Sequence, residues 1–274
     1  MSKIVKNQIA LLGGIIVLLY VIISIFGPYF TPYTPDQMNP DEMLMPPSKK
    51  HLFGTDQFGR DIFTRIIYGT RVSFSVGIFA VSIAGTLGVI AGLLGGFFGG
   101  WIDALFMHIM DIIFTFPAML LAIFIMAILG ETIINIVMAI GIVYTPQFAR
   151  VTRASVLSIK NMDYIQAAKA LGVPSGRILV KHVLKNAIAP IIVQVSLTLS
   201  LTVLLESALS FLGLGVQPPA PSWGNMLSTS REFMIIAPWT AIFPGLAIML
   251  LVLGFNLLGD GLRDILDPRL KNVL

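Results

Sequence analysis

The chain contains no cysteine and few charged residues. Disulfide bonds, zinc–thiolate sites and a cysteine nucleophile are therefore excluded. Only 12% of the 274 residues are charged and 56% are hydrophobic, whereas an ordinary soluble domain has about 25% charged residues. The mean hydropathy of +0.88 agrees with this composition. The sequence therefore indicates an integral membrane protein.

The motifs of nucleotide and metal chemistry are also missing. There is no G-x-x-x-x-G-K-[ST] segment to cradle phosphates and no H-E-x-x-H zinc motif. The three histidines, His51, His108 and His182, fall in separate segments, so a metal site built from them is disfavoured. We expect no cofactor in this chain.

Six long runs lack any charged residue, and each can supply one membrane span of roughly 20 apolar residues. No sustained alternation of polar and apolar residues predicts strands, so we expect an all-α membrane protein with six transmembrane helices. The runs cover residues 7–35, 72–102, 112–130, 132–149, 186–205 and 233–259.

Basic residues are unevenly distributed between the two sides of these spans. Seven of the eighteen Lys and Arg residues lie in a polar island, residues 150–186, which carries one acid, Asp163. With the N-terminus inside, twelve lie on the cytoplasmic side and six outside, which predicts that both termini are cytoplasmic. We expect the first run to be a signal anchor rather than a cleaved signal, because its apolar stretch is long and no small-x-small site follows it.

Two segments on the predicted outer side are substantial. Residues 31–71 begin with a proline-rich stretch that predicts an extended loop, and Ile62 to Tyr68 show helical apolar spacing that suggests an interfacial helix. Asp56 and Asp61 flank Arg60, an arrangement that favours a local salt bridge or helix cap over acid–base chemistry. The second segment, residues 213–238, contains the turn-rich string GVQPPAPSWG.

Ionisable residues are almost absent from the predicted spans, which argues against a proton- or sodium-driven transporter. Glu206, at the end of the fifth run, is the exception of most interest. It either faces a translocation path near the outer gate, or is a carboxylate anchored at the interface or paired with Arg231. Both interpretations stay open at this point.

Small residues and prolines punctuate the spans. Glycines at positions 88, 92, 96 and 100 line one helical face and allow another backbone to approach closely. Pro117, Pro146 and Pro244 interrupt later spans and can kink helices that line a cavity.

The polar island predicts two short amphipathic helices joined by a tight bend. Ile165, Ala168 and Leu171 share one face of the first helix, which Gly172 can end with a positive φ. Ser175 can cap a second helix, which carries Ile178, Leu179, His182 and Val183. Composition leaves open whether this hairpin docks a soluble partner or packs on its own bundle.

The island resembles the coupling loop of permease subunits of binding-protein-dependent ABC importers. That family pattern is E-A-A, three residues, G, nine residues, I-x-L-P. Residues at the matching positions are Gln166, Ala167, Ala168, Gly172 and Leu184. Three positions depart from it: Gln166 replaces the Glu, His182 the Ile and Lys185 the Pro.

Four further motifs indicate which branch of this permease family the chain resembles. They are FGTDQFGRDIFTRIIYGTRVS (53–73), GGWIDALFMHIMDIIFTFP (99–117), SFLGLGVQPPAPSWG (210–224) and NLLGDGLRDILDPRL (256–270). Together they are similar to the second, C-type, permease subunit of dipeptide, oligopeptide and nickel importers, over nearly the whole chain from Phe53 onward.

The resemblance implies a type I ABC importer permease fold in the bacterial cytoplasmic membrane. Residues 1–71 would form an N-terminal transmembrane helix and extracytoplasmic loop, and residues 72–274 the core permease domain with its coupling loop at 150–186. The partners would be a homologous B-type permease, two cytoplasmic ATPases that bind ATP and Mg, and an extracytoplasmic solute-binding protein. The chain itself would not be an enzyme.

The resemblance also implies roles for particular residues. The ATPase cleft would receive Gln166, Ala167, Ala168, Leu171 and Gly172. The outer segments 53–71 and 213–238 would receive the binding protein or shape the outer gate. Glu206 and Pro117 are candidates for the translocation path or gate.

The cargo and the functional class of the protein each leave alternatives open. Di- or oligopeptides are the expected cargo, with nickel, metal–chelator complexes or glutathione as alternatives within the same architecture. A self-contained channel or secondary transporter is a rival from another class. A membrane-embedded enzyme is a third, but no convergent nucleophile–base set or metal set is found in the sequence.

Overall fold

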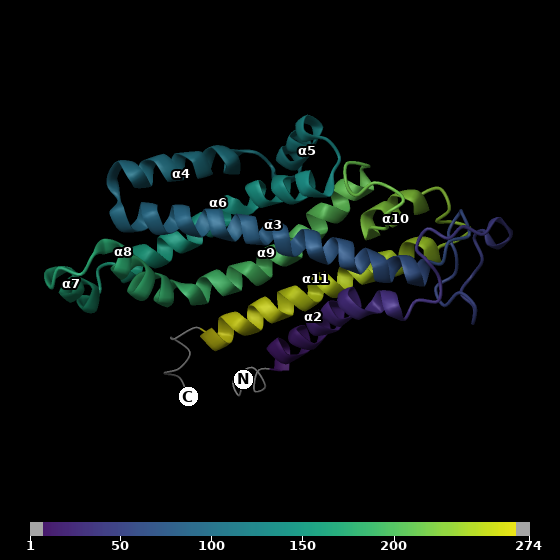
Figure 1. The fold of residues 1–274 in the computed structure, drawn as a ribbon, viewed down its shortest axis with the longest axis horizontal. Helices are drawn as coiled ribbons and strands as arrows, with labels where there is room; N and C mark the ends of the chain where they lie inside the picture. The colour runs from purple at the N-terminus through teal and green to yellow at the C-terminus, as the bar shows by residue number, and fades with distance from the viewer. Residues whose placement is uncertain (1–7, 267–274) are drawn as a thin grey trace.

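The chain folds as a bundle of long helices (Figure 1), seen in a computed structural model that describes residues 8–266. No β-strand occurs within those residues. Helices satisfy their backbone hydrogen bonds internally, which a lipid environment requires. The long helices are α2 (Gln8–Phe26), α3 (Ile62–Phe98), α6 (Ile133–Ile159), α9 (Lys185–Phe211) and α11 (Trp239–Leu266).

Shorter helices connect or cover the long ones. They are α4 (Gly100–Thr115), α5 (Ala118–Leu129), α7 (Asp163–Ala170), α8 (Ser175–Ile178) and α10 (Trp223–Ser230), with 3-10 turns at Gly27–Tyr29 and Pro40–Glu42 and a π-helical segment, η3, at Leu179–Leu184.

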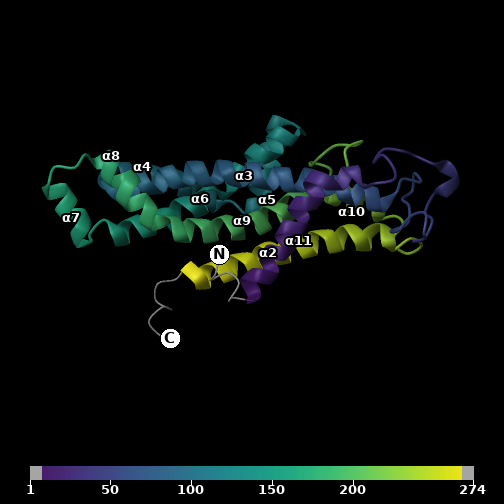
Figure 2. The ribbon, with the colours of Figure 1, turned by 60° about the horizontal axis from the view of Figure 1, so that its bottom comes forward.

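The bundle is elongated and its two ends differ. Helices α7 and α8 lie at one end, while the loop before α3 and helix α10 lie at the other (Figures 1 and 2). Helix α2 packs along α11, and the start of α2 and the end of α11 are both directed toward the α7 end. The count of basic residues predicts that the polar island lies on the same side as both termini. The structure agrees, because α7 and the ends of α2 and α11 nearest the termini are directed toward the same end of the bundle.

Within residues 8–266, five helices are long and apolar enough to cross a membrane, or six if the bent pair α4 and α5 counts as one span. This confirms the all-α membrane fold. The third predicted run is not straight, because α4 and α5 meet at an angle of 93°. Pro117 begins the second arm, and Phe116 before it is extended, as residues preceding proline generally are.

Helix α3 begins earlier than the sequence suggested. Its 37 residues correspond to about 55 Å, well beyond the roughly 30 Å of a hydrocarbon core. The prediction of an interfacial helix at Ile62 to Tyr68 is wrong: these residues are the first turns of α3, where Ile62 and Ile66 are buried. The reason is tertiary, since both pack in one cluster with Trp223 and Leu251 instead of facing headgroups.

The glycine stripe brings α3 against α6. A Cβ on Gly88 would lie 2.5 Å from the Thr145 carbonyl oxygen, and one on Gly92 would lie 2.5 Å from the Ala149 carbonyl oxygen. Gly96 also faces α6, where a Cβ would lie 2.9 Å from the Val156 side chain. Gly100 does not belong to the contact, because it starts α4 with φ +56° and has open space around it.

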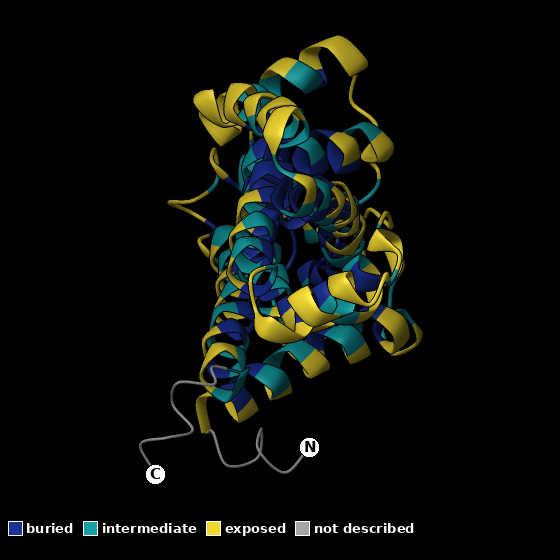
Figure 3. Ribbon diagram, turned by 90° about the vertical axis from the view of Figure 1, so that its left-hand side faces the viewer, coloured by how far each residue is buried: buried dark blue, intermediate teal, exposed yellow. Residues whose placement is uncertain are grey.

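Buried residues fill the centre of the bundle and exposed apolar residues cover its flanks (Figure 3). Helix α2 shows this most clearly, because its exposed residues include Leu12, Ile15 and Leu18. Large apolar side chains around a bundle are expected where lipid is the solvent.

We expect Gly92→Ala to weaken the α3–α6 contact, because the added methyl meets main-chain atoms of α6 that cannot move aside. Overpacking of this kind costs about 1–3 kcal/mol. Gly77→Ala is the matched control in the same helix, since its Cβ would lie 3.8 Å from the flexible end of Leu199. Thermal unfolding of the purified protein in detergent measures the difference, and equal midpoints for the two variants would contradict it.

Candidate functional site

Helix α7 stands at one end of the bundle with one face buried and the other exposed. Ile165 is fully buried and packs with Val156, Ile178 and Val183, and Ala168 is partly buried against them. The outward face carries Gln166, Ala167, Leu171 and Gly172, all exposed. The expectation that Leu171 shares the face of Ile165 is wrong: the helix ends at Ala170, and Leu171 is 83% exposed.

Gly172 ends α7 as predicted. Its φ is +74°, a conformation that favours glycine. The Gly172 N–H donates to the Lys169 carbonyl and the Val173 N–H to the Ala168 carbonyl, at 3.0 and 3.1 Å. This pair of bonds is a Schellman motif, and it leaves Gly172 at an exposed corner with nothing within 4 Å of a Cβ position.

The second predicted helix is not separate. Ser175 makes no cap, because Pro174 occupies that position and α8 begins at Ser175 itself. Helix α8 then continues through η3 into α9, so one helical segment runs from Ser175 to Phe211. A displacement of α7 would therefore pass across the short bend at Gly172 to a single long helix.

Polar contacts fasten the island to the bundle. The Gln166 side-chain amide donates to the Lys160 carbonyl at 2.9 Å, and Lys160 donates to the Gly96 carbonyl at 2.9 Å. Arg153 donates twice to Asp103, at 2.6 Å each, and ties α6 to α4. The island both packs on its own bundle and keeps one face exposed, so the two interpretations of the hairpin are compatible.

Glu206 is fully buried near the opposite end of the molecule. Its carboxylate accepts hydrogen bonds from Ser73 of α3 at 2.9 Å and from Ser210 of α9 at 2.8 Å. The proposed pairing with Arg231 is wrong, because the Arg231 guanidinium lies over the Phe211 ring, 5.3 Å from its centroid. Full burial also argues against a solvated interfacial anchor. Glu206 instead joins α3 to the end of α9.

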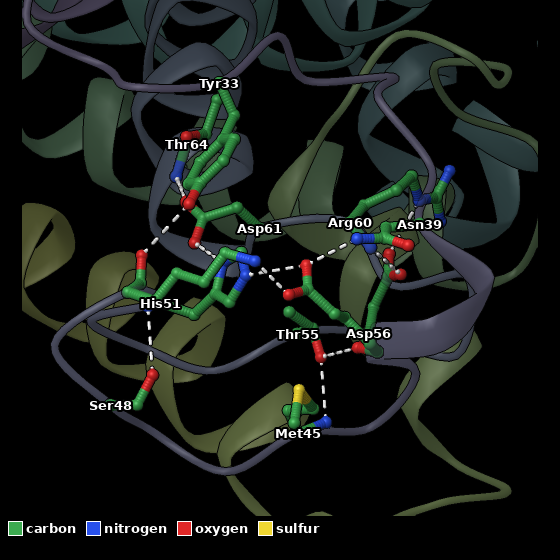
Figure 4. Close-up of polar contacts among 12 residues, drawn as sticks. Tyr33, Asn39, Met45, Ser48, His51, Thr55, Asp56, Arg60, Asp61 and Thr64 are labelled. Carbon is green, nitrogen blue, oxygen red and sulfur yellow. Dashed lines mark hydrogen bonds and ion pairs between the residues drawn. The ribbon is translucent and has the colours of Figure 1, made fainter.

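The loop before α3 is organised by buried polar residues (Figure 4). Asp61 caps α3 by accepting from the Thr64 N–H at 2.8 Å and also contacts His51 Nδ1 at 2.9 Å. Asp56 accepts from Arg60 Nε at 2.7 Å. The preference for a salt bridge and a helix cap over acid–base chemistry is therefore confirmed.

Glu42 completes this loop cluster. Hydrogen bonding from Lys50, and to a lesser extent from His51 and Asn39, holds the pKa of the Glu42 carboxyl below its usual range. The same contact raises the pKa of the Lys50 ammonium. These shifts come from structural pairing and provide no acid or base poised for catalysis.

Pro117 lies at the α4–α5 break, beside a hollow that Tyr144 and Gln147 also line. Sequence reasoning missed Gln147 and a second glutamine, Gln194, which are hydrogen-bonded to each other at 3.1 Å inside two spans. A search for charge overlooks them, whereas a search for side-chain amides within the charge-free runs would have found both.

Comparison with known proteins gives the family. The model of the binding-protein-dependent transport system inner membrane component matches residues 84–272. The chain belongs to this family. A second model, the N-terminal transmembrane domain of oligopeptide transport permease C, matches residues 1–47.

Similar proteins are permeases of dipeptide and glutathione transport systems. A dipeptide transport system permease protein of Alkalihalophilus pseudofirmus is 51% identical over 97% of this chain and 88% of its own length. Glutathione transport system permease proteins of Pectobacterium atrosepticum and Escherichia coli are 44% and 42% identical, over 98% and 97% of this chain and 90% and 88% of theirs. The permease described here is thus a C-type membrane component of this kind.

The fold also matches a solved structure. An amino acid ABC transporter crystallised with histidines aligns with a TM-score of 0.56 at 16% identity, covering 73% of this chain and 92% of that one. At that identity the match concerns the fold alone, and it agrees with the expected ABC importer permease architecture.

Ser210→Ala should destabilise the end of the permease where α9 meets α10. The change removes a donor to the buried Glu206 and the acceptor of the Val216 N–H, which lies 3.3 Å from the Ser210 hydroxyl. Leaving buried polar groups without partners costs about 1–3 kcal/mol. Ser82→Ala is the control, since that hydroxyl is exposed and bonds only to its own helix. Thermal unfolding in detergent tests this, and no difference between the two variants would refute it.

Proposed function

We propose that this permease is the C-type transmembrane subunit of an ATP-driven importer of di- or oligopeptides in the bacterial cytoplasmic membrane. It would work with a homologous B-type permease, two cytoplasmic ATPases and an extracytoplasmic solute-binding protein. The 51% identity to a dipeptide transport system permease over nearly the whole chain favours this cargo. ATP and Mg would bind the ATPases, so the permease would carry no catalytic residue or cofactor of its own.

The exposed face of α7 is the observation that carries the proposal. Ala167 is small, Leu171 projects as an apolar knob, and Gly172 leaves the corner beside them uncovered. An ATPase cleft that accepts this face buries Leu171, which otherwise stands in water. Ala168 and Gln166 would support the face from the side, through the buried cluster and through the bond to Lys160.

Coupling would then be mechanical. When ATP binding brings the ATPases together, α7 would move with them, and the helical segment from Ser175 to Phe211 would carry the motion through the membrane. Glu206 near its far end would transmit it to α3 through Ser73. Glu206 and the α4–α5 break at Pro117 are thus the proposed gate and path positions.

The orientation follows from the same assignment. With α7 in the cytoplasm, the ends of α2 and α11 directed toward it would place both termini there. The segments 53–71 and 213–238 would face the binding protein. Residues 1–71 and 72–274 would be functional divisions of one bundle, since α3 runs uninterrupted across the boundary between them.

Glutathione is the second candidate cargo, because relatives at 44% and 42% identity are named glutathione permeases. It is itself a small peptide, so the two candidates share amide chemistry. Nickel or a metal–chelator complex would use the same architecture without requiring metal ligands in the permease.

We expect Gly172→Trp to uncouple ATP hydrolysis from transport while the permease still inserts and folds. The φ of +74° makes a side chain cost about 1–2 kcal/mol locally, but the space around the Cβ is open. The indole would stand where the ATPase binds. Gly130→Trp is the matched control: its φ is +85° with equally open space, and it lies at the α5–α6 turn. Normal uptake by Gly172→Trp would count against the docking role.

ATP-dependent uptake into proteoliposomes tests the function as a whole. The permease would be reconstituted with the permease, ATPases and binding protein encoded beside it, and offered labelled dipeptide, a longer peptide, glutathione and a nickel–chelator complex. We expect the dipeptide or longer peptide to accumulate only with ATP and the ATPases. Accumulation without ATP would favour a channel or secondary transporter instead.

A further inference from the structure

Two glutamines face each other in the middle of the bundle. Gln147 lies near the centre of α6 and Gln194 within the first half of α9, and the Gln194 side-chain nitrogen donates to the Gln147 side-chain oxygen at 3.1 Å. Both side chains are partly exposed. Burying a polar amide in a membrane-spanning segment costs free energy unless its groups are hydrogen-bonded. Amide groups there without a partner therefore indicate a candidate binding site.

The pair leaves complementary hydrogen-bonding groups free. Gln194 uses both N–H groups, one to Gln147 and one to Thr198 at 2.9 Å, which leaves its oxygen as an acceptor. Gln147 uses its oxygen, which leaves two N–H donors. Within residues 8–266 neither the Gln194 oxygen nor the Gln147 nitrogen has a hydrogen-bond partner. One donor and one acceptor side by side match a peptide group, which offers one of each.

The two amides stand between two hollows. Gln194 lines a groove of about 610 Å³ that extends between α6, α9 and α11 as far as Arg263 near the end of α11. Gln147 lines the hollow of about 390 Å³ beside Pro117. Ligand pockets typically measure about 300–1,000 Å³, so the groove can hold a small peptide.

Prolines adjoin both glutamines. Pro146 immediately precedes Gln147, and Pro190 lies one turn before Gln194 and lines the groove. Each proline lacks the N–H that would bond the carbonyl four residues earlier, which belongs to Ile142 and Asn186 respectively. Asn186 also lines the groove. The Asn186 carbonyl, which loses its α-helical donor at Pro190, therefore adjoins the groove that Gln194 lines.

We propose that Gln147 and Gln194 form a transit site that binds the backbone of the peptide cargo. The Gln147 N–H groups donate to a peptide carbonyl and the Gln194 oxygen accepts a peptide N–H. These neutral amides would hydrogen-bond only the backbone of the cargo, so cargo peptides with different side chains could all bind. Two such bonds are weak enough for release, which a transport path needs. This inference rests on the proposed function and specifies how its cargo is contacted.

Backbone substitution in the cargo tests the acceptor. The complete reconstituted complex would be given a labelled dipeptide and its depsipeptide, in which an ester oxygen replaces the amide N–H, each at saturating loaded binding protein. We expect the unmodified permease to transport the ester about three- to tenfold more slowly, as the loss of one hydrogen bond implies. In Gln194→Leu the dipeptide should slow similarly and the preference should vanish.

A second variant separates cargo binding from bundle packing. Gln147→Glu keeps an oxygen that accepts from Gln194, so α6 and α9 stay linked, but it removes both donors. We expect peptide uptake to fall at least threefold while ATPase stimulation by the binding protein persists. Ser82→Ala, an exposed polar change on α3, is the control and should transport normally.

The outcomes discriminate between the explanations. An unchanged peptide-to-ester ratio in Gln194→Leu, or full uptake by Gln147→Glu, would mean that the amides only tie two helices together and would overturn the inference. No preference in the unmodified permease would do the same. ATP-driven uptake of some other cargo, with no peptide uptake at all, would instead defeat the proposed peptide cargo, and the inference would fall with it.

Discussion

The close contact between α3 and α6 is the constraint on which the rest of the bundle depends. Lipid offers no hydrophobic drive between helices, so their association relies on close packing and polar contacts. Gly88 and Gly92 let the α6 backbone approach α3 closely enough that a methyl group would not fit. This contact fixes where the following segments lie. It sets Gln147 and Phe148 at the centre, and it places Arg153 in the half of α6 nearer α7, where it holds α4 through Asp103.

The second organising feature is continuity between the two ends of the molecule. Helix α3 and the helical segment from Ser175 to Phe211 each contain 37 residues, about 55 Å, and both extend beyond the hydrocarbon core. Near one end the second segment is joined to α3 by Glu206 and Ser73, and at the other it meets α7 across the bend at Gly172. The proposed coupling to an ATPase at one end and opening at the other would need such rigid connections, because flexible joints would absorb the displacement.

The elements predicted best from the sequence are those set by local chemistry. Long apolar runs gave the spans, and Gly172 marks the end of α7 because only the local backbone decides it. Tertiary contacts decided the rest. The spacing of Ile62 to Tyr68 suggested an interfacial helix, because the sequence does not show that Trp223 packs against this segment and bonds the Ile66 carbonyl 157 residues away. No residue near Glu206 in the sequence identifies Ser73 as its partner. The sequence around Pro117 also does not show that α4 and α5 are separate helices at 93° instead of one kinked helix. The exposed residues of α7 rested on a resemblance, and their role stays a prediction.

The polar chemistry of the spans explains why charge is so scarce. A fixed charge in the path would bind one cargo terminus tightly and repel the other, and it would carry a large desolvation cost. Peptides vary in side chain but always present a donor and an acceptor in each amide group. Gln147 and Gln194 offer those complements without charge. Glu206, the one carboxylate fully buried within the described spans, instead accepts hydrogen bonds from Ser210 in its own helix and from Ser73 of α3, and the second of these joins two helices. In the proposed importer, specificity would then reside in the solute-binding protein that delivers the cargo. In the proposed importer the permease would need only to recognise the peptide group, and the two neutral amides would hold it weakly enough for release.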